Sequence, residues 1–162
     1  MLVVLTALAV VALDRWTKAW VLSRFQLHES MPVVPGVVRW TYVQNRGAAF
    51  GLLQDQMVLL VAVALVVIAV IVYWTPRLPG RAWVVRVALG LQLGGAFGNL
   101  VDRLRWGYVV DFIDLDFGPL HRFPVFNVAD AAIVTGTALL VLWLWLGEEA
   151  GLRPGGGGTN RL

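Results

Sequence analysis

Long apolar stretches separated by polar segments are the main pattern of this 162-residue chain. Met57 to Trp74 is an uninterrupted run of eighteen apolar residues, close to the roughly 20 that a membrane-spanning helix needs. Three further stretches are nearly as apolar, each with only a few polar interruptions. The pattern therefore predicts four transmembrane helices, over about residues 1–22, 57–74, 82–102 and 129–147.

A cleavable signal peptide is the alternative interpretation of the first stretch. Signal peptides begin with a basic segment, whereas this stretch passes from Met1 directly into apolar residues. Charges at positions 14, 15 and 18 would also interrupt the apolar core of a signal peptide. We therefore expect a retained helix.

Four spans place both termini on the same side of the membrane as the linker 75–81. That linker contains Arg77 and Arg81 and no acid, and Arg86 follows just inside the next span. Because cytoplasmic loops carry an excess of Arg and Lys, this side is expected to be cytoplasmic. Segments 23–56 and 103–128 then lie on the outer face.

The two outer segments differ in their patterns. The first contains a β-branched and aromatic run, Val37 to Gln44, bounded by Pro35-Gly36 and Gly47, and it predicts a short strand region. The second is expected to be an outer loop. The predicted fold is an all-α membrane protein with four transmembrane helices, a small extracytoplasmic β cradle and a periplasmic-side loop. We expect a single domain over 1–150 and a flexible glycine-rich tail over 151–162.

Composition supports a membrane location and excludes several site types. The chain is 59% hydrophobic and 14% charged, more apolar surface than a soluble protein of this size can bury. Its basic residues are scattered although the net charge is +3, which argues against nucleic-acid binding. The absence of cysteine excludes disulfides, thiolate zinc sites and cysteine nucleophiles.

A polar stripe and a glycine stripe run along the predicted third span. The polar stripe recurs at steps of three and four and so shares one helix face; its members are Gln92, Gly95, Asn99, Asp102 and Arg103. Gly90, Gly94 and Gly98 recur at every fourth residue, the spacing that lets membrane helices approach closely. This helix alone is equally consistent with interhelical hydrogen bonding and with a functional site.

Two further pairs of polar residues allow a structural or a functional interpretation. Asp14 and Lys18 are four residues apart, the favoured order for an ion pair within a helix. Asn127 and Asp130 are three apart, and Asp130 opens a span where a carboxylate is favoured by the helix dipole. An ion pair that anchors the end of a helix, and a carboxylate that caps one, explain these two pairs as well as a catalytic role does.

The positions of these polar residues along the spans favour a functional site. Seven of them fall near the outer ends of the predicted helices or just beyond, and would meet at one membrane depth; they are Asp14, Asn99, Asp102, Arg103, Asp111, Asn127 and Asp130. Ionisable residues inside spans usually face a bundle interior or a water-filled pocket.

Carboxylates are the reactive groups that remain after other chemistries are considered. The sequence has no G-x-S-x-G, H-E-x-x-H or P-loop motif. Two carboxylates in one site cannot both ionise cheaply, so one keeps a proton near neutral pH. Such a pair can hydrolyse an amide by general acid–base catalysis without a covalent intermediate.

Five ordered sequence blocks closely resemble bacterial lipoprotein signal peptidase (signal peptidase II). The blocks are Asp14-x-x-x-Lys18, Asn45-Arg46-Gly47-Ala48-Ala49-Phe50, Gly94 to Arg103, Val109-Val110-Asp111-Phe112 and Phe126-Asn127-Val128-Ala129-Asp130. They cover about residues 10 to 132, and the four-span layout is also shared.

The resemblance implies an aspartic endopeptidase that cuts before a diacylglyceryl-modified cysteine at the outer side of the bacterial cytoplasmic membrane. It implies that Asp111 and Asp130 are the catalytic pair. The residues implied to bind substrate or support the site are Asp14, Lys18, Asn45, Gly95, Asn99, Asp102, Arg103 and Asn127. No metal or other cofactor is expected; the expected partners are lipid-modified prolipoproteins and membrane lipid, with no nucleic acid, and a monomer suffices.

Two other functions are weighed against this one. A small transporter would carry polar residues along the length of several helices, whereas Met57 to Trp74 has none. A non-enzymatic membrane chaperone or lipoprotein assembly factor would tolerate Asp111→Asn and Asp130→Asn, which a protease would not.

Overall fold

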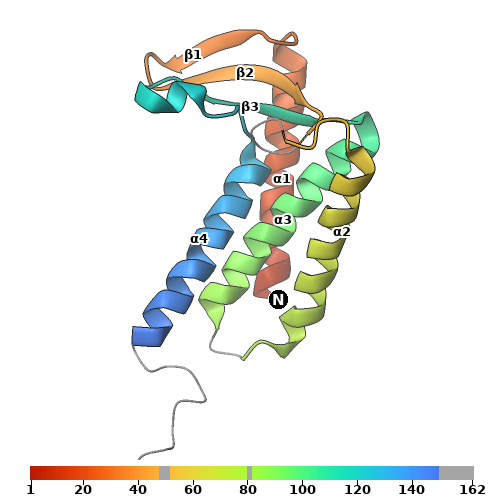
Figure 1. Ribbon diagram of the computed structural model, residues 1–162, viewed down its shortest axis with the longest axis vertical. Helices are drawn as coiled ribbons and strands as arrows, with labels where there is room; N and C mark the ends of the chain where they lie inside the picture. Colours follow the sequence, from red (N-terminus) through yellow and green to blue (C-terminus); the bar gives the residue numbers. More distant parts are fainter. Residues whose placement is uncertain (48–51, 80–81, 150–162) are drawn as a thin grey trace, which may run out of the picture.

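Four long helices and one small sheet make up the computed structural model, which describes residues 1–47, 52–79 and 82–149. In chain order the elements are α1 (Leu2–Arg24), β1 (Ser30–Val34), β2 (Val38–Asn45), α2 (Met57–Trp74), the short 3₁₀ helix η2 (Thr75–Arg77), α3 (Trp83–Trp106), β3 (Val109–Leu115), the 3₁₀ helix η3 (Gly118–Arg122) and α4 (Val128–Glu149). The helices form a bundle and the sheet lies across one end of it (Figure 1).

Among the described residues, three helical segments are long and apolar enough to cross a membrane, namely Met57–Arg77, Trp83–Trp106 and Val128–Leu146. They coincide with the second, third and fourth predicted spans. The first predicted span is also a helix, of 23 residues. Its charged residues at positions 14, 15 and 18 leave it outside this set.

The sheet contains more strands than the sequence pattern predicted. The predicted strand is β2, to which β1 pairs antiparallel through Ser30 and Thr41. β3 pairs antiparallel with the other edge of β2, with Val43 opposite Asp111. The segment expected to be an outer loop, over 103–128, instead contains the strand β3 at 109–115, whose first four residues are all buried. α3 also continues to Trp106, because the helix ends only at Gly107, whose positive φ of 77° suits glycine.

α3 is the central helix and contacts each of the other three. Its glycine stripe faces α1: a Cβ added to Gly94 would lie 2.7 Å from the Ala7 carbonyl oxygen, and one added to Gly98 would lie 2.8 Å from Asp14 Oδ2. The close helix approach that the glycine spacing predicted is therefore confirmed. Gly95 instead faces α4, where an added Cβ would lie 2.7 Å from Ile133 Cγ1.

An apolar cluster fixes the sheet to the end of α1. Val21 of α1 packs with Tyr42 of β2 and with Val110 and Phe112 of β3, and all four are buried. The ring of Trp40 lies 5.5 Å from that of Phe112. This packing holds β3, and with it Asp111, directly above the helix bundle.

Three predictions fall outside the described residues. They are the Ala48-Ala49-Phe50 part of the second sequence block, Arg81 in the linker, and the flexible tail over 151–162.

Candidate active site

A cavity of about 500 Å³ opens where α3, α4 and the sheet meet. Its polar wall is formed by Asn45, Asn99, Arg103, Asp111 and Asp130. Its apolar wall comes from β3, the segment after η3 and the first turns of α4, and includes Leu115, Phe123, Pro124, Val125, Phe126, Ile133 and Val134. Two carboxylates from different elements therefore share one mostly apolar cavity.

Asp111 lies in β3 with its side chain on the cavity wall, only 1% exposed. Its carboxylate accepts hydrogen bonds from Asn45 Nδ2 at 2.9 Å and from Asn127 Nδ2 at 2.6 Å. Burial, reinforced by the nearby charge of Asp130, raises the pKa of Asp111 to about 7, although the two amide donors and Lys18 act in the opposite direction. Asp111 therefore holds a proton close to neutral pH far more readily than an exposed aspartate.

Asp130 lies in the first turn of α4 and takes part in a reciprocal cap. Its backbone N–H donates to Asn127 Oδ1 at 2.9 Å, and its Oδ2 accepts from the Asn127 backbone N–H at 3.3 Å, the arrangement of a capping box. Its other oxygen accepts from Asn99 Nδ2 at 2.7 Å. Asp130 can therefore cap α4 and also belong to the cavity, because one carboxylate oxygen takes part in the cap and the other is bound by Asn99.

Two asparagines connect the two aspartates. Asn127 Nδ2, which donates to Asp111, also donates to Asn99 Oδ1 at 3.1 Å, and Asn99 donates in turn to Asp130. The side chain of Asn127 is completely buried. The chain Asp111–Asn127–Asn99–Asp130 therefore fixes the two carboxylates relative to each other through three hydrogen bonds.

Arg103 and Asn45 tie the cavity to the chain that follows β2. Arg103 Nη2 donates to the Gly47 carbonyl at 3.1 Å, and Asn45 Oδ1 accepts from the Gly47 N–H at 2.9 Å. Both side chains also line the cavity. The guanidinium thus supplies a cation to a cavity that contains two carboxylates.

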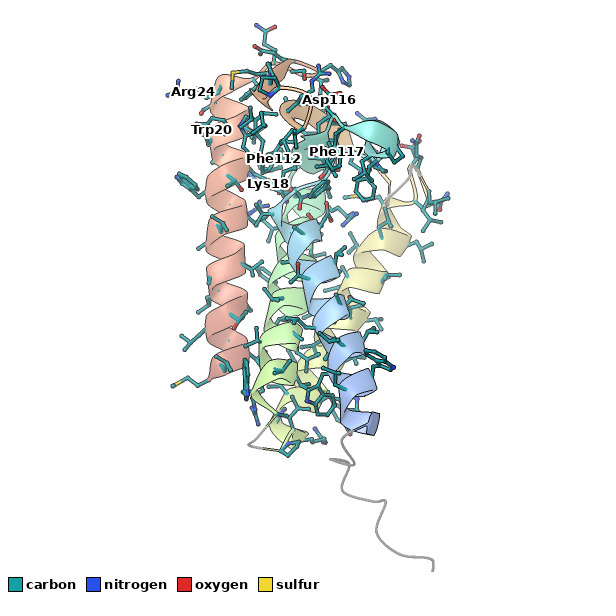
Figure 2. All side chains as sticks on the ribbon, turned by 90° about the vertical axis from the view of Figure 1, so that its left-hand side faces the viewer. Lys18, Trp20, Arg24, Phe112, Asp116 and Phe117 are labelled. Atoms are coloured by element: carbon teal, nitrogen blue, oxygen red, sulfur yellow. The ribbon has the colours of Figure 1, made fainter. Side chains whose placement is uncertain are left out.

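A cluster of buried charges lies next to the cavity, between α1 and α3. The predicted Asp14–Lys18 pair is present, with Lys18 Nζ 3.0 Å from Asp14 Oδ1. The same ammonium lies 2.7 Å from Asp102 Oδ2 and donates to Asn99 Oδ1 at 3.1 Å. Lys18 is 1% exposed and lies beneath Phe112, where the helices meet the sheet (Figure 2).

Sequence reasoning missed Arg15. Its Nη2 lies 2.7 Å from Asp14 Oδ2 and 2.6 Å from Asp102 Oδ1. Residue 15 is one position away from the Asp14–Lys18 face, so helical periodicity excluded it. The signal that could have found it is the length of the Arg side chain, which lets the guanidinium reach round the helix to a neighbouring face.

Gly95 lies apart from the other predicted site residues. It packs against α4 beside Ala129 and Ile133, so its contribution is to let α3 and α4 approach. Within residues 1–47, 52–79 and 82–149, no group of three or more His, Asp or Glu side chains is placed to hold a metal ion.

Known proteins resemble this chain over most of its length. A family model described as signal peptidase (SPase) II, Peptidase_A8, matches residues 6–146. A lipoprotein signal peptidase from Halothermothrix orenii is 41% identical over 150 residues, covering 93% of this chain and 99% of the relative. One from Streptococcus pyogenes serotype M6 is 43% identical over 150 residues, with 93% and 97% covered.

Two solved structures, both described as a bacterial membrane enzyme determined by the in meso method, have the same fold. The first, at 2.3 Å resolution, superposes with a TM-score of 0.83 at 28% identity, covering 98% of this chain and 94% of that one. The second, at 1.9 Å resolution, gives 0.77 at 33% identity, with 88% and 91% covered. The resemblance seen in the five sequence blocks is confirmed, and the chain belongs to the signal peptidase II family.

Proposed function

We propose that this chain is an aspartic endopeptidase of the bacterial cytoplasmic membrane that removes the signal peptide from diacylglyceryl-cysteine-modified prolipoproteins. Asp111 and Asp130 are its catalytic pair. The observation that carries the proposal is that these carboxylates, from β3 and α4, line one cavity and are joined through Asn127 and Asn99. Membership of the signal peptidase II family supports the substrate class.

The pair shares one proton at neutral pH. The raised pKa of Asp111, caused by burial and by Asp130, is the behaviour expected of two carboxylates that cannot both ionise cheaply. The ionised carboxylate takes a proton from water as the water oxygen attacks the scissile carbonyl carbon. The protonated carboxyl donates to the carbonyl oxygen. When the tetrahedral intermediate collapses, the C–N bond breaks and the departing nitrogen takes a proton from the pair.

The remaining polar residues hold this pair and the substrate. Asn45 and Asn127 orient Asp111, and Asn99 orients Asp130, by the hydrogen bonds described above. Arg103, on the cavity wall, is placed to bind a carbonyl of the substrate backbone. Asp14, Lys18 and Asp102 support the site from beneath, and Gly95 sets the distance between α3 and α4.

The cavity suits a lipid-anchored substrate. Most of its wall is apolar, and Ile133 and Val134 extend it along α4, so acyl chains can lie beside the helices. The polar wall lies at the sheet end of the bundle, where a scissile bond at the depth of the lipid headgroups would be. The sheet forms a cradle over the substrate, and the segment containing η3 forms a lid.

The proposed topology has four spans, with α1 as the first. Its buried polar residues, Asp14 and Lys18, are paired with each other and face the bundle. The apolar residues Val4, Leu5 and Leu8 are exposed on its outside, where lipid would cover them. α3 has 24 residues, about 36 Å at 1.5 Å per residue, enough to cross a bilayer core of about 30 Å.

The proposed orientation follows from the arrangement of the helix ends. The N-terminus, the end of α2 and the start of α3 lie at the end of the bundle away from the sheet (Figure 1). Arg77 and Arg86 belong to this end, which makes it cytoplasmic by the positive-inside rule. Both termini are then cytoplasmic and the cavity is at the outer face. The protein acts as a single membrane domain over 1–150, and one copy contains the whole catalytic pair.

Cleavage of a lipidated prolipoprotein by the purified protein in detergent tests this function. We expect wild type to shorten the substrate on a gel and to leave an unlipidated substrate intact. Asp111→Asn and Asp130→Asn should lose at least about a thousandfold in turnover while keeping the wild-type melting temperature within a few degrees at about pH 8. Asp116→Asn, which changes a 41% exposed carboxylate of the same region, is the matched control and should cleave normally.

Three results would reject the proposal: no cleavage by wild type, full activity of either dyad variant, or equal cleavage of unlipidated substrate. No cleavage by the purified protein, together with normal lipoprotein assembly in cells that carry the dyad variants, would favour an assembly factor instead. A transporter is disfavoured by α2, a candidate span with no Asp, Glu, Lys, Arg or His between Met57 and Trp74.

A further inference from the structure

Four charged side chains form a closed ring between α1 and α3, which we call the charge ring: Asp14, Arg15, Lys18 and Asp102. Lys18 Nζ contacts Asp14 Oδ1 and Asp102 Oδ2 at 3.0 and 2.7 Å. Arg15 Nη2 contacts the other two oxygens, Asp14 Oδ2 and Asp102 Oδ1, at 2.7 and 2.6 Å. Each cation therefore bridges the same two carboxylates, and each carboxylate oxygen has one cation.

The two carboxylates of the charge ring also bind the chain next to each dyad residue. Asp102 Oδ2 accepts the backbone N–H of Val110 at 3.2 Å, and Val110 directly precedes Asp111. Asp14 Oδ1 accepts the backbone N–H of Ala129 at 3.2 Å, and Ala129 directly precedes Asp130. The distance between Asp14 and Asp102 therefore affects where β3 and the start of α4 lie, in each case at the residue directly before a dyad aspartate.

Arg15 is the member of the charge ring with no assigned role. It lies at an unspecified position of the Asp14-x-x-x-Lys18 block, and it does not line the cavity. Its Nη2 also donates to the Gly98 carbonyl of α3 at 3.1 Å, so two hydrogen bonds, to Asp14 and Gly98, and the ionic contact with Asp102 meet at one nitrogen. That convergence fixes the guanidinium.

We propose that Arg15 is a positioning residue of the peptidase: by closing the charge ring, it sets the separation and orientation of Asp111 and Asp130. This inference rests on the proposed function of the dyad. Arg15 acts through Asp14 and Asp102 and touches neither dyad carboxylate nor the cavity.

Charge balance explains why the ring needs both cations. With Arg15 and Lys18 the two anions are matched by two cations. Without Arg15 one buried negative charge is uncompensated, and Asp14 and Asp102 are drawn together only by Lys18 on one side. Oδ2 of Asp14 and Oδ1 of Asp102 then lose their cation and repel each other. The two carboxylates shift, and the Val110 and Ala129 N–H groups shift with them.

Steady-state cleavage by Arg15→Gln and Arg15→Lys tests the role. A displacement of reacting groups by about 1 Å can cost about 100-fold in rate. We expect Arg15→Gln to lower kcat by about 10- to 100-fold with KM within about twofold of wild type. Arg15→Lys, which keeps a cation and can still bridge both carboxylates, should recover most of this loss.

The matched control is Arg105→Gln. Arg105 lies at the same end of the bundle and, like Arg15, stacks near the Trp106 ring, at 5.1 Å against 6.0 Å for Arg15. It should keep wild-type kcat and KM, because it is outside the charge ring. A purely structural role for Arg15 predicts a lower melting temperature with normal kcat in the folded fraction, and that result overturns the proposal. Equal losses in Arg15→Gln and Arg15→Lys overturn it too.

Hydrogen–deuterium exchange of Arg15→Gln, with Arg15→Lys as its control, gives a second measurement that does not depend on turnover. In Arg15→Gln we expect faster exchange confined to the peptides that contain Val110 and Ala129, and in Arg15→Lys exchange close to that of wild type. Unchanged exchange at both sites, or faster exchange throughout the bundle, overturns the positioning role. If wild type does not cleave at all, the proposed function fails, whereas cleavage by wild type with unaltered Arg15→Gln kinetics rejects only the role of Arg15.

Discussion

α2 and the polar end of the bundle are two regions built on opposite principles. Of the eighteen residues of α2, only Leu60 and Ile71 are buried, and no side chain is an acid, an amide or a basic group. At the sheet end of α1, α3 and α4, charged and amide side chains are buried instead, among them Lys18, Asn99, Asp102 and Asn127. A lipid environment requires only that the side chains of α2 be apolar. A buried polar atom needs a partner at about 3 Å, so the polar end depends on individual positions.

Lys18→Met should lower the free energy of unfolding more than any other substitution considered below, because it breaks the charge ring. Removal of one partner of a buried ion pair typically costs about 3–5 kcal/mol, and here Asp14 and Asp102 both lose a cation. We expect a strongly lowered melting temperature in detergent, measured by tryptophan fluorescence. Arg24→Met, at an exposed position near the end of the same helix, is the control and should change stability by less than about 0.5 kcal/mol. Equal melting temperatures for the two variants would contradict a ring that stabilises the bundle.

The pH dependence of stability should also come from the polar end. Because the folded protein raises the pKa of Asp111 from 3.8 to about 7, the folded state holds this proton more tightly than the unfolded chain. The stabilisation is therefore fully present below pH 3.8 and is lost as the pH rises through about 7. Between about pH 5 and pH 8 the loss should be roughly 2–3 kcal/mol.

Melting temperatures of wild type and Asp111→Asn across this range measure the effect. The asparagine cannot titrate, so the wild-type advantage over the variant should shrink by roughly 5–10 °C on going from about pH 5 to about pH 8. A wild-type advantage that stays constant or grows with pH would show that Asp111 is ionised across the range.

Gly94→Val contrasts a fixed helix contact with a lipid-facing one. The first added carbon would lie 2.7 Å from the Ala7 carbonyl oxygen and 2.7 Å from Val10 Cβ, so α1 and α3 must separate. Overpacking of this kind costs about 1–3 kcal/mol. Ala62→Val adds the same type of side chain at an exposed position of α2 and should be nearly neutral. Thermal unfolding of both variants decides the comparison, and a neutral Gly94→Val would mean that α1 and α3 do not meet at the glycine stripe.

The same contrast explains how much of the structure could be predicted from the sequence. The helices over 57–74, 83–106 and 128–149 follow from apolar run length, a property that each segment carries by itself. Asn99 and Asp130 could be singled out because a polar residue inside a span is costly, and Asp111 because it falls just beyond a predicted span. Asn45 was implied only by the resemblance of the ordered sequence blocks to a known family.

What could not be predicted depends on contacts between distant segments. β3 was expected to be loop because its strand is stabilised by pairing with β2, more than sixty residues earlier, and by Val110 and Phe112 packing on Val21. Arg15 was missed because its partner Asp102 comes from another helix. The role of Gly95 in packing against α4 likewise requires the relative placement of two helices.

The smallest effect is expected from replacing Val63, Val66 and Val70 of α2 together by leucine. All three are at least half exposed, and leucine keeps the surface apolar while favouring the helix slightly. If only lipid covers this face, stability should change by less than about 0.5 kcal/mol and kcat and KM should stay within about twofold of wild type. The variant should also sediment in detergent as wild type does. A loss above about 1.5 kcal/mol, or a change in oligomeric mass, would show that this face packs specifically against another protein surface, and α2 would then depend on individual positions as the polar end does.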